Sequence, residues 1–266
     1  MWKIGFSLGA ALIASSTWAG GPEAPGKSCR LQSSEHRVPV LELYTSEGCS
    51  SCPPADRWLS GLPQRGISAD TAVLLAFHVD YWNGLGWPDR FSNPAFSARQ
   101  REVAAYASNG VVFTPQVVLD GRSLGVAYSL DTLTDRLARI NREPAPASIS
   151  ANIMAVGKQL RVSGEVQVAD RSARRDARAW IAVFEQGLST RVRAGENAGR
   201  MLQHDFVVRE LAGPFPVGAD GHGRIDQIIP MRAEWADAQI GLAIFVQHRD
   251  DGGTLQAASS FPICGP

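Results

Sequence analysis

Two nearly continuous apolar runs, residues 38–44 and 73–79, most constrain how this chain can fold. Runs of this kind suit strands that are buried on both faces, as in a parallel sheet. Between them, apolar side chains from Ala55 to Leu62 recur at the spacing of one helix face. Strand, helix and strand together predict a βαβ unit.

The rest of the chain predicts two domains. Helix and hairpin signals continue to residue 142, so we predict an α/β domain over residues 38–142, after an irregular lead-in at 20–37. The Pro/Ala-rich segment 143–147 predicts a stiff linker. From 148 to 266 the hydrophobic period changes to two, and short strand patterns separated by turn signals predict an all-β sandwich-like domain.

Composition excludes several classes of protein. Apolar residues make up 44% of the chain, which is enough for a sizeable core. Lys+Arg and Asp+Glu are balanced at 26 each, and no basic stripe supplies a local positive patch. We therefore predict no nucleic-acid partner, because such binding depends on phosphate contacts from basic side chains.

The first 19 residues predict a signal peptide. Lys3 precedes a mainly apolar run, and Thr17 and Ala19 offer small residues at a cleavage site. The run is shorter than the ~20 apolar residues that a membrane-spanning helix needs. The alternative is an uncleaved anchor. We expect a periplasmic or secreted protein without a membrane span in its mature chain.

Four cysteines are expected to pair in an oxidising compartment. Cys49 and Cys52 are a natural pair because only two residues separate them. Cys29 and Cys264 would then form a structural disulfide between the two ends of the mature chain. The alternative for this second pair is two free or intermolecular thiols.

The Cys-x-x-Cys sequence follows a predicted strand and opens a predicted helix, which is typical of a thiol–disulfide redox motif. Cys49 would be the exposed nucleophile, activated at the helix N-terminus, and Cys52 the resolving thiol. Pro53 and Pro54 follow at once, and proline fits a helix only in its first turn. Either the helix begins near Ser51, with Cys49 just outside it, or its first turn is distorted.

This motif, together with Thr114-Pro115 before a later strand, resembles the thioredoxin fold. The resemblance implies that Pro115 is cis, lies against the disulfide and has neighbouring backbone that pairs with a bound substrate chain. It carries over to Cys49, Cys52 and Pro115. The chain differs in having Ser-Ser between the cysteines and Gly48 where a tryptophan is usual.

A closer resemblance extends over most of the mature chain. The chain resembles a secreted, thioredoxin-like bacterial family catalogued as a domain of unknown function, number twelve twenty-three. The segments that look like the signature of this family are residues 40–56, 77–82, 106–115, 195–197 and 204–205. This resemblance implies the fold and export. It implies no activity, because the family has none to carry over.

Several further residues are candidates for supporting roles. Glu47 and Asp80 are expected at the loop-bearing edge of the sheet, where a carboxylate could assist proton transfer. Trp82 could form part of a peptide-binding wall, and Thr114 precedes the proline. The alternatives are solvated carboxylates and an aromatic residue that fixes the loop to the core.

A soft metal is a weaker candidate. Cys49, Cys52 and His78 form a ligand set suited to Cu(I). The alternative is a hydrogen-bonded histidine at the edge of the core. We predict no cofactor and no metal.

These observations favour an exported thiol–disulfide oxidoreductase that acts on protein thiols and disulfides or on a small thiol. Two alternatives stay open. The first is a non-catalytic binding module with a structural disulfide, and the second is a copper-binding or copper-delivery protein.

Overall fold

The computed structural model describes Met1 and residues 27–106, 110–125, 129–235 and 239–264. The segment predicted as a signal peptide lies outside these residues, apart from Met1. The described part contains 14 strands in three sheets and few helices. In chain order the elements are β1 (Lys27–Gln32), β2 (Val40–Thr45), α1 (Pro53–Ser60), η1 (Pro63–Arg65), β3 (Val73–His78), η2 (Asn83–Leu85), α2 (Pro94–Tyr106), β4 (Gln116–Leu119), β5 (Arg122–Ser123), α3 (Leu130–Ile140), β6 (Ala147–Val156), β7 (Gln159–Val168), α4 (Arg171–Arg174), β8 (Ala177–Glu185), β9 (Leu188–Arg191), β10 (Met201–His204), β11 (Val207–Pro216), β12 (His222–Pro230), β13 (Ile240–His248) and β14 (Thr254–Ser260).

The largest sheet has eight strands in the order β14-β13-β8-β11-β3-β2-β4-β5. β2 and β3 run parallel from the Val40↔Val73 pair to the Thr45↔His78 pair, with α1 between them in the chain. Both strands are buried along their whole length, as their continuous apolar sequences indicate. The predicted βαβ unit is therefore present at the centre of this sheet.

The predicted fold class, an α/β thioredoxin-like domain followed by an all-β sandwich-like domain, is wrong. The chain is mostly β-sheet, and strands from both sides of residues 143–147 share one sheet, because β11 pairs with β3 on one side and with β8 on the other. The reason is visible in β13, whose residues from Ile240 to Gln247 are all buried. A strand buried on both faces suits the interior of a large sheet rather than an outer layer. The boundaries drawn at 38, 142 and 148 stay predictions.

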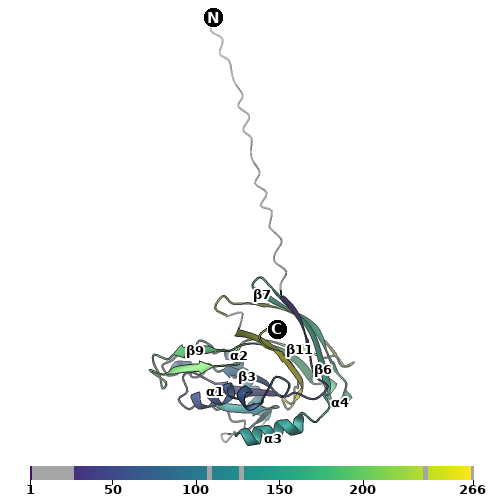
Figure 1. The fold of residues 1–266 in the computed structure, drawn as a ribbon, viewed down its shortest axis with the longest axis horizontal. Coiled ribbons are helices and arrows are strands. Elements are labelled where there is room, and N and C mark those ends of the chain that lie inside the picture. The colour runs from purple at the N-terminus through teal and green to yellow at the C-terminus, as the bar shows by residue number, and fades with distance from the viewer. Residues whose placement is uncertain (2–26, 107–109, 126–128, 236–238, 265–266) are drawn as a thin grey trace.

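A four-stranded antiparallel sheet, in the order β1-β6-β7-β12, covers one face of the large sheet (Figure 1). Its strands alternate buried and exposed residues, as the period of two predicts. Ile149 and Val162 of this sheet pack in one core with Ile181 and Ile244 of the large sheet. A second core lies between the large sheet and the helices and includes Leu59, Phe96 and Leu133 as buried residues.

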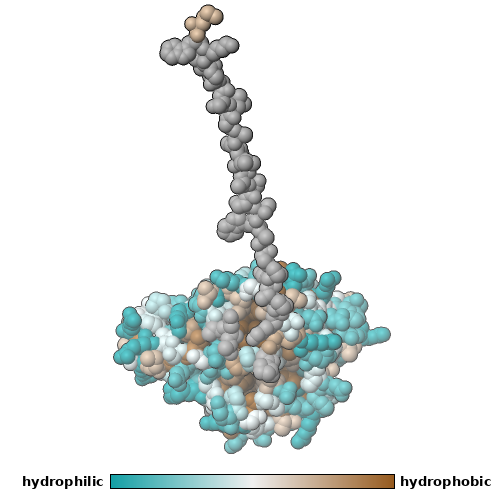
Figure 2. All heavy atoms as spheres, turned by 45° about the horizontal axis from the view of Figure 1, so that its top comes forward, coloured by the Kyte–Doolittle hydropathy of each residue, from teal (hydrophilic) through white to brown (hydrophobic). Residues whose placement is uncertain are grey.

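β9 and β10 form a separate hairpin, and β10 packs on α1 (Figure 1). On the face that Figure 2 shows, hydrophilic side chains form most of the rim and hydrophobic ones gather towards the middle. Within the described residues, no helix is both long and apolar enough to span a membrane.

Candidate functional site

The Cys49–Cys52 disulfide lies between the end of β2 and the start of α1, with a Cα–Cα distance of 5.4 Å. Cys52 caps α1, and Pro53 and Pro54 occupy the first helical turn, where their missing N–H groups leave no hydrogen bond unmade. Cys49 is therefore just outside the helix. Of the two arrangements that the prolines allowed, the structure shows the one with Cys49 outside the helix, which begins immediately after the second cysteine.

Cys49 and Cys52 are both fully buried, and each residue is 0% exposed. The predicted exposure of Cys49 is therefore wrong, and its role as the attacking thiol stays a prediction. Ser50 and Ser51, which lie between the cysteines, are exposed, and Ser51 Oγ lies 3.4 Å from Cys49 Sγ. The exposed part of the motif therefore consists of its two serines, and its sulfur atoms lie beneath the surface.

A turn at residues 195–197, between β9 and β10, holds the disulfide loop in place. The buried Asn197 donates from Nδ2 to the carbonyl oxygens of Glu47 and Cys49, at 2.9 Å each. The Ser50 backbone N–H donates to Glu196 Oε2 at 2.9 Å. These bonds come from a segment almost 150 residues further along the chain. We call residues 195–197 the clamp.

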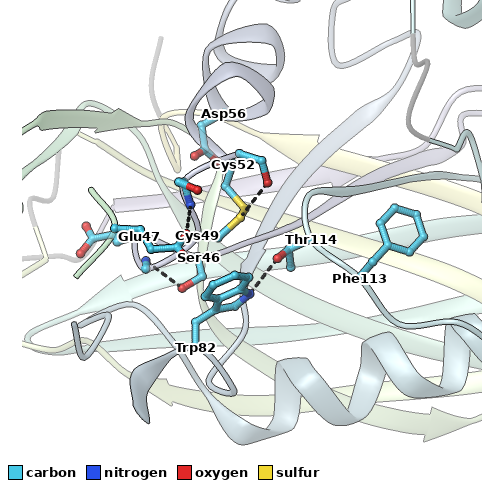
Figure 3. The surroundings of a disulfide bond; sticks show 12 residues. Ser46, Glu47, Cys49, Cys52, Asp56, Trp82, Phe113 and Thr114 are labelled. Carbon is cyan, nitrogen blue, oxygen red and sulfur yellow. Dashed lines mark hydrogen bonds between the residues drawn. A yellow bond between two sulfur atoms is a disulfide. The ribbon is translucent and has the colours of Figure 1, made fainter. Parts of the chain in front are cut away.

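Trp82 connects the disulfide loop to the proline loop (Figure 3). Its Nε1 donates to Thr114 Oγ1 at 2.8 Å, and the Thr114–Pro115 peptide is cis, as the resemblance to thioredoxin implied. A Cβ on Gly48 would lie 3.2 Å from Trp82 Cβ, so the close approach of Trp82 favours glycine before Cys49. Trp82 thus packs on the loop that carries the motif.

Asp80 is engaged elsewhere. Its carboxylate accepts a hydrogen bond from the Ser97 hydroxyl, and the Asp80 backbone N–H donates to Ser97 Oγ at 3.0 Å. This contact connects the loop after β3 to α2. The structure therefore brings Glu47, Trp82 and Thr114 together around the disulfide loop and turns the Asp80 carboxylate towards α2.

Five ionisable side chains gather in the interior next to the motif, each at most 6% exposed. We call them the ionisable cluster: Glu47, Asp56, His78, Asp89 and His204. His78 Nδ1 lies 2.7 Å from Asp89 Oδ2, which also accepts the Glu47 N–H at 2.8 Å. His204 Nε2 lies 3.4 Å from Glu47 Oε1, and its Nδ1 lies 3.9 Å from Asp56 Oδ2. The two imidazole rings meet edge to face, 5.0 Å apart.

The pKa values of Glu47 and Asp56, the two carboxyl groups of the cluster that are closest to the motif in sequence, are shifted in opposite directions. Burial would raise the pKa of Glu47, but His204 and the Trp87 N–H, which donates to it at 2.8 Å, outweigh burial and lower it. Burial raises the pKa of Asp56, and the neighbouring His204 offsets only part of that increase. Glu47 is therefore held as the carboxylate, whereas Asp56 keeps a proton more readily.

His78 and Asp89 behave as a buried ion pair. Burial would lower the pKa of His78, but the Asp89 carboxylate outweighs it and raises that pKa. Burial would raise the pKa of Asp89, yet His78 and two backbone N–H groups lower it. The copper set is not assembled, since Cys49 and Cys52 bond to each other, and the described residues contain no group of three or more His, Cys, Asp or Glu side chains arranged to hold a metal.

Sequence reasoning missed three members of the cluster. It assigned no role to Asp56, Asp89 or His204. A signal existed for Asp56, because it follows Ala55 and precedes Leu59 on the buried face of α1, where a carboxylate is unusual. Nothing local predicted His204, since β10 approaches α1 only through the tertiary fold.

Comparison with solved structures supports the fold. A crystal structure of a protein from Agrobacterium tumefaciens is similar, with a TM-score of 0.62 and 25% identity over 86% of this chain and 96% of that one. HBP35 of Porphyromonas gingivalis has the same TM-score at 13% identity, over 86% of this chain and 76% of its own, which is a likeness of fold alone.

No curated protein matches the chain. The family model described as "Protein of unknown function (DUF1223)" matches residues 40–247, which include the disulfide motif, the proline loop, the clamp and every member of the ionisable cluster. The chain therefore belongs to the DUF1223 family.

Proposed function

We propose that this protein is an exported thiol–disulfide oxidoreductase whose Cys49–Cys52 couple exchanges electrons with thiols of a protein or a small molecule. The observation that carries the proposal is the position of this disulfide next to the buried ionisable cluster. Burying ionisable groups is unfavourable unless they are paired, and such groups collect where their pKa values serve a reaction. Apolar side chains would fill the same space at lower free energy.

The size of the disulfide loop supports the proposal. In the chain-entropy model, a bond between residues three apart stabilises the fold by about 2 kcal/mol. The Cys29–Cys264 bond, at a separation of 235, gives about 5 kcal/mol in the same model. The Cys49–Cys52 bond therefore contributes less to stability than the Cys29–Cys264 bond. Stability alone does not explain why this bond lies beside the ionisable cluster.

Export is part of the same proposal. Both cysteine pairs are disulfide-bonded, and such bonds persist mainly in oxidising compartments. The signal-peptide pattern of residues 1–19 points the same way.

The sulfurs must become accessible before they can react. Asn197 donates two hydrogen bonds to the disulfide loop and Glu196 accepts one from it. Gly195 at φ +74° and Gly199 at φ +84° flank these two residues. Glycine tolerates this backbone region and adapts to rearrangement there. We therefore propose that displacement of the clamp opens the disulfide to a partner thiol.

Replacing Asn197 with alanine should speed reduction of the Cys49–Cys52 bond by dithiothreitol at least fivefold. The variant loses two buried hydrogen bonds to the disulfide loop, each worth about 1 kcal/mol. Stopped-flow tryptophan fluorescence would follow the reaction. Arg191→Ala, an exposed change on the same hairpin, is the control and should react at the wild-type rate. An unchanged rate in Asn197→Ala would contradict the gating role.

A redox titration with mass-spectrometric mapping of alkylated thiols tests the function itself. We expect Cys49 and Cys52 to become reducible in the folded protein at potentials above about −300 mV, while Cys29–Cys264 stays oxidised as the internal control. Cys49→Ser should abolish reduction of a model disulfide, and Cys52→Ser should accumulate a mixed disulfide on Cys49. A Cys49–Cys52 bond that resists reduction until the protein unfolds would contradict the proposal.

One observation favours a second candidate. Full burial of both sulfurs suits a non-catalytic binding module in which the disulfide is structural. The same titration separates the two, because the binding module requires a bond with a potential below about −300 mV.

A further inference from the structure

We infer that Asp56 carries the proton to and from the Cys52 sulfur when the Cys49–Cys52 bond is broken or formed. This inference rests on the proposed exchange function and assigns a proton-transfer residue to it. Three independent features of the structure support it: the position of Asp56 on the helix, its access to solvent and the charges around it.

The helix brings the two side chains together. Asp56 follows Cys52 by four residues, and its N–H donates to the Cys52 carbonyl oxygen at 3.1 Å, as in a regular helical turn. Residues four apart lie on one helix face, and helical side chains lean towards the N-terminus. The Asp56 carboxyl group therefore leans back along α1 towards the turn that carries Cys52, and Figure 3 shows both residues at the start of this helix.

Asp56 also has a route to water. A cavity of about 210 Å³ is lined by Pro53, Asp56 and Arg57 of α1 and by Met201, Leu202 and Gln203 of β10. Asp56 is 6% exposed, whereas Glu47 is 0% exposed. Because Asp56 lines this cavity, its carboxyl group can exchange a proton with solvent while the Cys52 sulfur stays covered.

The surrounding charges favour Asp56 over Glu47 for this role. The groups that act on Asp56 come from four neighbouring segments. They are His204 of β10, His78 of β3, Thr45 of β2 and Asp89 of the loop before α2. Arg57 of α1 lines the same cavity. Burial outweighs these groups and raises the pKa of Asp56, whereas Glu47, with its lowered pKa, stays ionised. Paired carboxyl groups with separated pKa values commonly divide proton transfer from charge stabilisation.

The step balances as follows. A partner thiolate attacks Cys49 Sγ, the Cys49–Cys52 bond breaks, and the electron pair of that bond leaves on Cys52 Sγ. Neutral Asp56 donates its proton to this thiolate, so no uncompensated anion remains on the buried sulfur. A second partner thiolate then attacks the partner sulfur of the mixed disulfide and releases Cys49 as a thiolate. Cys49 and the Asp56 carboxylate each take up one proton from water, which replaces the two protons that the partner thiols released. Two partner thiols are thereby oxidised to a disulfide. In reverse, the Asp56 carboxylate takes the proton from the Cys52 thiol, which then attacks the mixed disulfide.

The reverse direction allows a direct test with a chromogenic aromatic disulfide. Fully reduced Cys49–Cys52 protein, with Cys29–Cys264 intact, should release the coloured thiolate in two phases. The first reports attack by Cys49, and the second reports resolution by Cys52. For Asp56→Asn we expect the second phase to slow at least tenfold near pH 7, with the first phase within twofold of wild type. The ionisation that limits the wild-type second phase on its acid side should be absent.

Two further variants make the outcome decisive. Asp135→Asn places the same change on an exposed site of α3 and should leave both phases unchanged. Asp56→Glu keeps a carboxyl group and should recover part of the second phase together with its pH dependence, which a merely structural role would not restore. An Asp56→Asn protein with a wild-type second phase and pH profile would overturn the inference alone. If wild-type protein showed no second phase, the proposed function would fail with it.

Discussion

Replacing Cys29 and Cys264 together with serine should lower the free energy of unfolding by about 5 kcal/mol. The expected loss is large because the bond joins residues separated by 235 positions, so its removal frees a very long loop in the unfolded chain. Cys29 lies in β1 opposite Ile153 of β6, and Cys264 follows β14. The bond therefore connects edge strands of the four-stranded and eight-stranded sheets.

The second disulfide supplies the matched control. Replacing Cys49 and Cys52 together should cost about 2 kcal/mol, because their loop is short. Denaturant unfolding of the wild type and both double variants, followed by circular dichroism, would measure the difference. Equal losses would show that loop length does not determine what these bonds contribute, and would remove one argument for a redox role of the shorter bond.

The sequence predicted the centre of the large sheet and both cysteine pairs for local reasons. Apolar runs at 38–44 and 73–79 report burial on both faces, and the short spacing of Cys49 and Cys52 makes their pairing geometrically easy. With that pair formed, only Cys29 and Cys264 were left. The prolines after the motif also had a local explanation, since both fit the first turn of α1.

The sequence did not predict what distant segments contribute. The alternating strands β6 and β7 suggested a separate sandwich, whereas the continuous apolar sequences of β8 and β13 carried the information that these strands join the sheet of β2 and β3. The clamp lies in the turn between β9 and β10, and His204 lies in β10, so both approach the motif from distant positions in the chain. Periodicity describes which face a residue occupies, but it does not say which distant element covers that face.

A buried ion pair between Glu42 of β2 and Arg99 of α2 provides the second large expected effect on stability. Arg99 of α2 donates from Nη2 and Nε to the two carboxylate oxygens of Glu42 at 2.8 and 2.9 Å, and both residues are at most 6% exposed. Arg99 also donates to Gln247 at 2.8 Å, which links α2 to β13. Burial would lower the pKa of Arg99, but Glu42 outweighs it and raises that pKa.

Arg99→Met should lower the free energy of unfolding by about 3–5 kcal/mol, because it leaves the Glu42 carboxylate buried without its cation. Urea unfolding at pH 7 would measure this loss. Arg101→Met, on the exposed face of the same helix, should change stability by less than about 0.5 kcal/mol. The double variant Glu42→Gln with Arg99→Met should recover much of the loss, since it removes the unpaired charge. A single Arg99→Met variant as stable as Arg101→Met would show that solvent reaches Glu42 and that the pair does not hold α2 against the sheet.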